Sequence, residues 1–131
     1  MTKPHLIEFP KIGASEIGYI SVVENSKLIP FDIKRVFWTY YTPESIVRGR
    51  HAHHKTEQVL IALSGRIVVT TEMPDGDILT FILDNPYIGV YVPAAAWHTM
   101  QYSHTAIQLV LASEIYSEAD YIRNYEDFKK P

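Results

Sequence analysis

Short runs of apolar and β-branched residues, each ended by a turn signal, are the feature that most restricts the fold of this 131-residue chain. Runs of this length with such punctuation are typical of strands. The runs predicted as strands are 19–24, 33–41, 59–63, 66–71, 78–83, 88–92 and 100–112. Ser64-Gly65 predicts a tight hairpin, and 73–77 is the strongest turn. We therefore expect an all-β fold, most simply a double-sheet jelly roll.

The C-terminal region is the one part of the sequence with a convincing helical pattern. Ser117 is placed to cap a helix, with Asp120 three residues later. Tyr121, Tyr125 and Phe128 then follow at helical spacing. We expect a short C-terminal helix that docks on the β-domain.

Length and composition limit the classes of function. The length fits one domain over residues 1–131, and the 47% hydrophobic content supports a packed core. The chain has no cysteine, which suits a reducing compartment, so we expect a cytoplasmic protein. No apolar segment approaches the roughly 20 residues that span a bilayer. The net charge of -3 comes with dispersed Lys and Arg, so we expect neither nucleic acid nor membrane as a partner.

The segment from Arg48 to His53 places two imidazoles two residues apart in a region predicted as strand. Because strand side chains alternate between faces, His51 and His53 should point the same way and His54 the opposite way. Imidazoles titrate near neutral pH, so such a pair can move protons on a bound anion or hold a metal ion. A purely structural role is the third interpretation.

The spacing of these histidines resembles that of the cupin superfamily. The segments that carry the resemblance are His51-x-His53 followed by Gln58 and Gly65, and Pro93-Ala94-Ala95-Ala96-Trp97-His98, with Ala95 in the usual glycine position. The resemblance implies a cupin jelly roll, that is, a double-stranded β-helix. A metal-binding cupin would use three histidines and a carboxylate. Gln58 is neutral and a poorer ligand than a carboxylate, so we expect no metal and no other cofactor, with a metal-dependent cupin enzyme as the alternative.

Most of the chain, from Glu8 to Lys130, closely resembles the thymidine-diphosphate-4-keto-6-deoxyglucose 3,4-ketoisomerases. The matching segments include 30–36, 48–53, 57–60, 89–93, 97–98, 111–113 and 120–125. This resemblance implies a metal-free homodimer that acts on a dTDP-linked 4-keto-6-deoxy sugar. The implied reaction moves the carbonyl from C4 to C3 during deoxysugar biosynthesis for polysaccharides or glycosylated products. A sugar-nucleotide-binding cupin without turnover is the alternative from another class.

The resemblance also implies roles for the histidine pair. His51 would be the base for proton transfer between C3 and C4, and His53 the relay or oxyanion partner. An imidazole that titrates near the working pH is well matched to both halves of such a transfer. His98 is expected to face the same site.

Further residues are expected to bind the substrate. Arg48 would meet the diphosphate, because a guanidinium makes paired, charge-assisted hydrogen bonds to phosphate. Arg35 is either a second ligand of this kind or a paired structural charge. Gln58 would hydrogen-bond the sugar or fix an imidazole tautomer.

The aromatic candidates for stacking on thymine or lining the sugar pocket are Tyr41, Tyr91 and Trp97. Aromatic residues of β-proteins also serve in the core, which is the alternative for each of them. Ile17 precedes Gly18 where the resembling family often has arginine or tyrosine. This departure bears on how the sugar is oriented and on the configuration of the product at C4.

Overall fold

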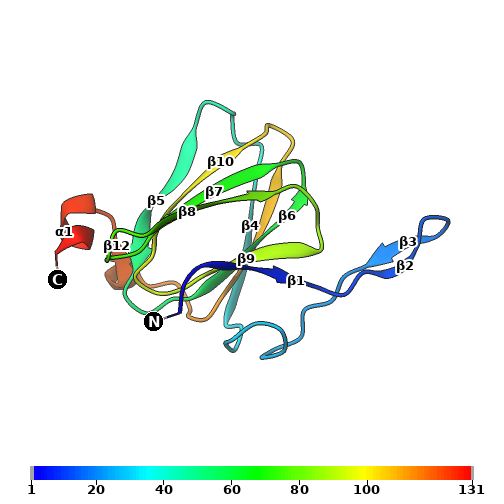
Figure 1. Ribbon diagram of the computed structural model, residues 1–131, viewed down its shortest axis with the longest axis horizontal. Coiled ribbons are helices and arrows are strands. Elements are labelled where there is room, and N and C mark those ends of the chain that lie inside the picture. The colour runs from blue at the N-terminus through cyan, green and yellow to red at the C-terminus, as the bar shows by residue number, and fades with distance from the viewer. Residues whose placement is uncertain (1, 131) are drawn as a thin grey trace.

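The computed structural model describes residues 2–130 and confirms the jelly roll: two antiparallel sheets pack face to face (Figure 1). The first sheet contains, in spatial order, β1 (His5–Glu8), β9 (Ile88–Val92), β6 (Gln58–Ser64), β11 (Ile107–Ala112) and β4 (Arg35–Tyr40). The second contains, in spatial order, β12 (Tyr121–Ile122), β5 (Val47–His53), β10 (Trp97–Tyr102), β7 (Ile67–Glu72) and β8 (Ile78–Leu83). Strands β4 and β5 are therefore consecutive in sequence but lie in different sheets.

The first sheet is covered on both faces, which β6 illustrates. Leu60 and Ala62 point into the core between the sheets, whereas Val59 and Ile61 belong to a second apolar cluster on the outer face. Side chains along a strand alternate between faces, so a strand buried on both sides has an uninterrupted apolar sequence. Residues 29–33 supply part of the outer cover.

A two-stranded hairpin projects away from the two sheets (Figure 1). It consists of β2 (Ile12–Ala14) and β3 (Gly18–Ile20). The strand expected over 19–24 was therefore wrong beyond Ile20. The hairpin exposes large apolar side chains at Ile12, Ile17 and Ile20.

The strand expected over 100–112 is in fact two strands in different sheets. A turn at 103–106 separates β10 from β11, and the Ala106 N–H donates to the Ser103 carbonyl over 2.9 Å. The Ser103 hydroxyl also accepts from the Arg66 N–H over 2.9 Å. Ser-His-Thr at this point is polar turn chemistry within an otherwise strand-forming sequence. The chain passes here from the second sheet to the first.

The C-terminal helix α1 (Tyr125–Lys129) begins later than expected. Asn124 caps it by accepting from the Glu126 and Asp127 N–H groups over 2.9 and 3.2 Å, whereas Ser117 makes no side-chain cap. Between Ser117 and Asn124 the chain forms a single 3₁₀ turn and then strand β12, which pairs with the end of β5. Among residues 2–130, no helix is both long enough and apolar enough to cross a bilayer.

Asp120 fixes this C-terminal segment to the connection between β5 and β6. Its carboxylate accepts from the Lys55 N–H over 2.7 Å, from the Thr56 N–H over 3.1 Å and from the Thr56 hydroxyl. Burial raises the pKa of Asp120, but these hydrogen bonds outweigh burial and the pKa lies below its ordinary value. The carboxylate thereby holds Tyr121 beside His53.

We predict that Asp120→Ala lowers the free energy of unfolding by about 2–3 kcal/mol, because it leaves the N–H and hydroxyl of buried Thr56 without their acceptor. Urea denaturation measures the change. Glu16→Ala, which removes an exposed carboxylate in the β2–β3 turn, is the matched control and should change stability by less than about 0.5 kcal/mol. Equal effects of the two substitutions would contradict a stabilising role for the hydrogen bonds of Asp120.

Candidate functional site

A bulge in β5 determines which of its side chains face the space between the sheets. His51 pairs with His98, but the next pair joins Gly49 to Thr99, so Arg50 is the extra residue. Both Gly49 and Arg50 have positive φ, 86° and 60°, and a Cβ on Gly49 would lie 2.8 Å from the His98 carbonyl oxygen. The extra residue reverses the alternation. Arg48 and His51, three positions apart, consequently line the same cavity.

Three imidazoles meet where β5 and β10 pair. The ring centroid of His51 lies 4.9 Å from that of His53 and 4.7 Å from that of His98. His53 and His98 are fully buried and His51 is half-buried. The expectation that His51 and His53 point the same way is confirmed, and His54 is exposed, as the alternation requires.

Backbone carbonyls fix the tautomer of two of these rings. The Nδ1 atom of His51 lies 3.1 Å from the Gly49 carbonyl oxygen, and that of His98 lies 3.0 Å from the Ala96 carbonyl oxygen. Because a carbonyl oxygen only accepts, each Nδ1 carries the hydrogen and each Nε2 keeps a lone pair. The Nε2 of His53 is buried without a hydrogen-bond partner among residues 2–130. Among residues 2–130, none of the three rings makes a hydrogen bond through its Nε2.

Burial keeps these imidazoles neutral. It lowers the pKa of His51 below its ordinary value, although the hydrogen bond to Gly49 acts in the other direction. Burial, reinforced by the positive charge of a protonated His51, lowers the pKa of His53 to about 4 and that of His98 to about 3. At neutral pH the cluster thus offers bases rather than cations.

The imidazoles border a cavity of about 210 Å³ between the sheets. His51, His98 and Gln58 lie toward one end, and Tyr102, Gln108 and Thr39 toward the other. Two guanidinium groups, those of Arg48 and Arg123, line the same cavity. His53 lies behind the lining, in contact with His51.

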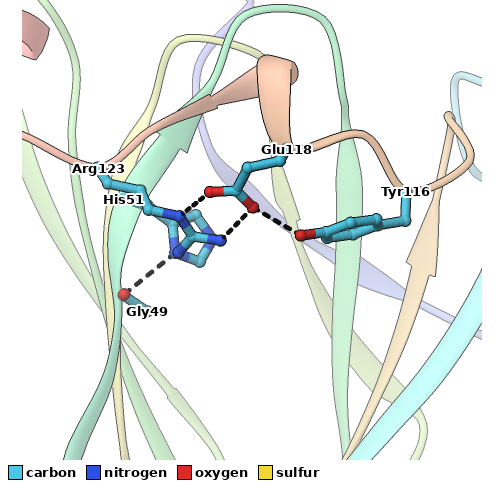
Figure 2. A network of polar contacts seen from close by, with 5 residues as sticks. All are labelled: Gly49, His51, Tyr116, Glu118 and Arg123. Atoms are coloured by element: carbon cyan, nitrogen blue, oxygen red, sulfur yellow. Dashed lines mark hydrogen bonds and ion pairs between the residues drawn. The ribbon is translucent and has the colours of Figure 1, made fainter.

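The segment after β11 closes the site with a network of polar contacts (Figure 2). The Glu118 carboxylate accepts from Arg123 Nε and Nη2 over 2.6 and 3.0 Å and from the Tyr116 hydroxyl over 2.6 Å. These two partners lower the pKa of Glu118 to about 2. The Arg123 guanidinium lies 4.2 Å from the centroid of the Tyr121 ring. That ring in turn packs against His51 and His53, at 5.0 and 4.5 Å between centroids.

The structure brings Arg48, Gln58, His51 and His98 together but places the other expected ligand residues elsewhere. Tyr91 lies on the outer face of β9, where its hydroxyl donates to Glu57 over 2.5 Å. Trp97 packs on Tyr125 and Phe128, at 5.3 and 5.6 Å between ring centroids. Tyr91 faces outward because strand side chains alternate between faces. Trp97 lies outside the cavity because α1 docks against it.

Three further residues also lie outside the cavity lining. Tyr41 is 75% exposed and contacts Tyr40 edge to face. Arg35 lies over the rings of Phe37 and Tyr116, and its Nε is buried without a partner among the described residues. Ile17 is at the tip of the projecting hairpin and 83% exposed. Within residues 2–130, the hairpin tip does not reach the cavity of its own chain.

Sequence reasoning missed several residues of the site, chiefly Tyr121, Arg123 and Gln108. The first two lie in the region predicted as helical, where the alternation of strand faces does not apply. One signal for Gln108 was present: it is a polar residue within the apolar run 107–112. An uncharged polar residue in a strand buried on both faces indicates a polar neighbour in the interior.

The three imidazoles are the side chains of the site that could hold a metal ion. The ligand atoms of His51, His53 and His98 lie within 4.8 Å of one another, the one such group in the described part of the chain. Their cavity is lined by two guanidinium groups and, among the described residues, by no carboxylate. A dication there would have three neutral nitrogen ligands and no anionic one, and the positive charge of Arg48 lines the same cavity.

We predict opposite effects on the pKa of His51 from the two members of the Glu118–Arg123 pair. Glu118→Gln leaves Arg123 uncompensated and should lower that pKa further, whereas Arg123→Gln leaves Glu118 uncompensated and should raise it. We expect changes of a few tenths of a pH unit, because the pair is partly exposed. NMR titration of the His51 ring measures them. The double variant should titrate close to the wild type, and parallel changes in the two single variants would contradict the electrostatic contact.

Comparison with known proteins places this site in a family. The family model described as "FdtA: WxcM-like, C-terminal" matches residues 2–131. A TDP-4-oxo-6-deoxy-α-D-glucose-3,4-oxoisomerase of Aneurinibacillus thermoaerophilus is 46% identical over 127 residues, which cover 95% of this chain and 89% of that protein.

Two solved structures of the 3,4-ketoisomerase QdtA from Thermoanaerobacterium thermosaccharolyticum are similar over nearly the whole chain. The complex with TDP has a TM-score of 0.91 and 38% identity, covering 97% of this chain and 92% of that one. A histidine-to-asparagine variant in complex with TDP-4-keto-6-deoxyglucose has a TM-score of 0.91 and 36% identity, covering 98% and 93%. With its jelly roll, its histidine pair and this agreement over its length, the chain belongs to the FdtA family of WxcM-like, sugar-nucleotide 3,4-ketoisomerase proteins.

Proposed function

We propose that this protein is an isomerase that converts TDP-4-keto-6-deoxyglucose to a TDP-linked 3-keto-6-deoxyhexose for deoxysugar biosynthesis. The observation that carries the proposal is the neutral His51 ring, whose Nδ1–H is held by Gly49 and whose Nε2 keeps its lone pair. A base of this kind at the wall of an internal cavity, in a chain 46% identical to a protein named for this isomerisation, supports both the reaction and the substrate.

The isomerisation requires one base for the proton on carbon. It also requires a route by which a proton passes from the oxygen on C3 to the oxygen on C4. The C4 carbonyl makes the hydrogen on C3 acidic. His51 Nε2 takes that proton, and the C3–H electron pair forms the double bond of an enediolate. Return of the proton to C4, with transfer of the hydroxyl proton from the oxygen on C3 to the oxygen on C4, leaves the ketone at C3. No oxidant is consumed, because the carbonyl is formed and lost within one molecule.

The roles of the remaining residues follow from the charge of the substrate and from the charge that forms during the reaction. Arg48 and Arg123 are the cations of the cavity and suit the diphosphate. His53 lies behind the cavity lining, where it is neutral and packs edge to face on His51, so we assign it the role of a relay that exchanges protons with His51. Positioned acid–base groups contribute about 10²–10⁴-fold to rate. Orientation and stabilisation of the enediolate supply the rest.

We predict that His51→Asn reduces kcat by at least about 10³-fold, because asparagine keeps a polar side chain but has no basic nitrogen. TDP binding, measured by calorimetry, should remain within about threefold of wild type, since the guanidinium groups are unchanged. His54→Asn, at the exposed neighbouring position, is the matched control and should keep full turnover. Normal turnover by His51→Asn would refute the assignment.

We further propose that the protein is a homodimer. The projecting hairpin exposes Ile12, Ile17 and Ile20. A cleft of about 590 Å³ lies on the outer face of the first sheet beside the hairpin, with a mainly apolar lining that includes Ile61, Leu63, Leu109 and Leu111. An exposed apolar patch of this kind supports contact with a second copy.

We predict that Leu63→Glu, which places a charge in this cleft, shifts the protein from dimer to monomer in sedimentation equilibrium. Ile78→Glu, at a similarly exposed position on β8 of the other sheet, is the control and should leave the mass unchanged. A dimer that persists in Leu63→Glu at micromolar concentration would place the interface elsewhere.

A further inference from the structure

Two buried polar side chains at the end of the cavity away from the imidazoles have no part in the proton transfer. Tyr102 ends β10 and Gln108 lies near the start of β11, so they come from different sheets. They are 2% and 1% exposed, and both line the cavity. Tyr102 is four residues beyond His98 on the same face of β10, about 13 Å along the strand.

Each of these side chains has a polar atom without a partner. The Tyr102 hydroxyl and Gln108 Oε1 make no hydrogen bond within residues 2–130. Burial raises the pKa of Tyr102 to about 12, so the hydroxyl keeps its hydrogen at neutral pH; the charge of Arg48 and the nearby polar groups of Thr39 and Gln108 oppose that rise. An unpaired buried polar group destabilises the folded state, because it has lost its hydrogen bonds to water. Phenylalanine and leucine would avoid this cost, which indicates that the polar atoms serve a ligand.

We propose that Tyr102 and Gln108 form a subsite that hydrogen-bonds the hexose of the sugar nucleotide, an inference that rests on the proposed function. A sugar hydroxyl both donates and accepts, so it matches an acceptor at Gln108 Oε1 beside a donor at Tyr102. A diphosphate at neutral pH has no hydrogen to donate to Gln108 Oε1. The pair therefore suits the sugar and not the phosphates, which Arg48 and Arg123 serve.

The size of the cavity supports the same assignment. Its volume of about 210 Å³ is below the roughly 300–1,000 Å³ of pockets that enclose drug-sized ligands. It has room for a sugar ring but not for the nucleoside as well. Because His51 lines this same small cavity, a group that reaches Tyr102 belongs to the ring that reacts at His51.

Binding measurements on Tyr102→Phe and Gln108→Leu test the subsite. Both are made in a His51→Asn background, so that TDP-4-keto-6-deoxyglucose is not consumed, and its Kd is compared with that of TDP by calorimetry. Loss of one neutral hydrogen bond should raise the Kd of the sugar nucleotide about 2- to 10-fold in each variant. The Kd of TDP should stay within twofold, and the melting temperature should be unchanged or higher.

Tyr40→Phe, which removes an exposed hydroxyl from β4, is the control and should change neither Kd. An unchanged Kd for the sugar nucleotide in Tyr102→Phe and Gln108→Leu would overturn the subsite, and so would equal weakening for TDP. Failure of the proposed function looks different: the protein with His51 intact would then bind TDP-4-keto-6-deoxyglucose without converting it, while the selective loss in the two variants would persist.

Discussion

The site depends on one irregularity, the bulge at Arg50 in β5. Without the extra residue, Arg48 and His51 would lie on opposite faces of the sheet. The bulge requires two residues with positive φ, and only glycine fits at position 49, against the His98 carbonyl. The same bend places the Gly49 carbonyl where it holds the His51 ring. A single local departure from regular strand geometry thus brings a guanidinium group and an imidazole to one cavity.

Burial is the second determinant, because it decides the protonation state of the cluster. Three imidazoles in contact would repel one another if charged, and their withdrawal from water removes that state. Burying these polar rings costs free energy. The apolar core between the sheets and the hydrogen bonds from Lys55 and Thr56 to the Asp120 carboxylate offset that cost. The Tyr121 ring then covers the pair, with Arg123 held over it by Glu118. These residues form a fixed electrostatic setting around His51.

Features that follow a repeating pattern along the chain could be predicted from the sequence. Features that depend on one irregular residue, such as the bulge in β5, could not. Short apolar runs ended by turn signals predicted the all-β fold, alternation predicted the shared direction of His51 and His53, and the resemblance over most of the chain indicated the family. The sequence did not reveal the bulge in β5, because Gly49-Arg50 has the composition of a polar loop. Aromatic type alone does not identify residues that stack on a ligand: Tyr91 and Trp97 pack away from the cavity. Arg123 and Tyr121 come from a segment whose position depends on Asp120, which is 65 residues from its partner Lys55 in sequence.

The central claim is that His51 carries a proton between adjacent carbons of the sugar. It is tested most directly by incubating TDP-4-keto-6-deoxyglucose with the protein in D₂O and locating deuterium by NMR. We expect deuterium on C4 of the 3-keto product when the base exchanges its proton with solvent, and neither deuterium nor product with His51→Asn. Deuterium at these carbons at an undiminished rate in His51→Asn would contradict it.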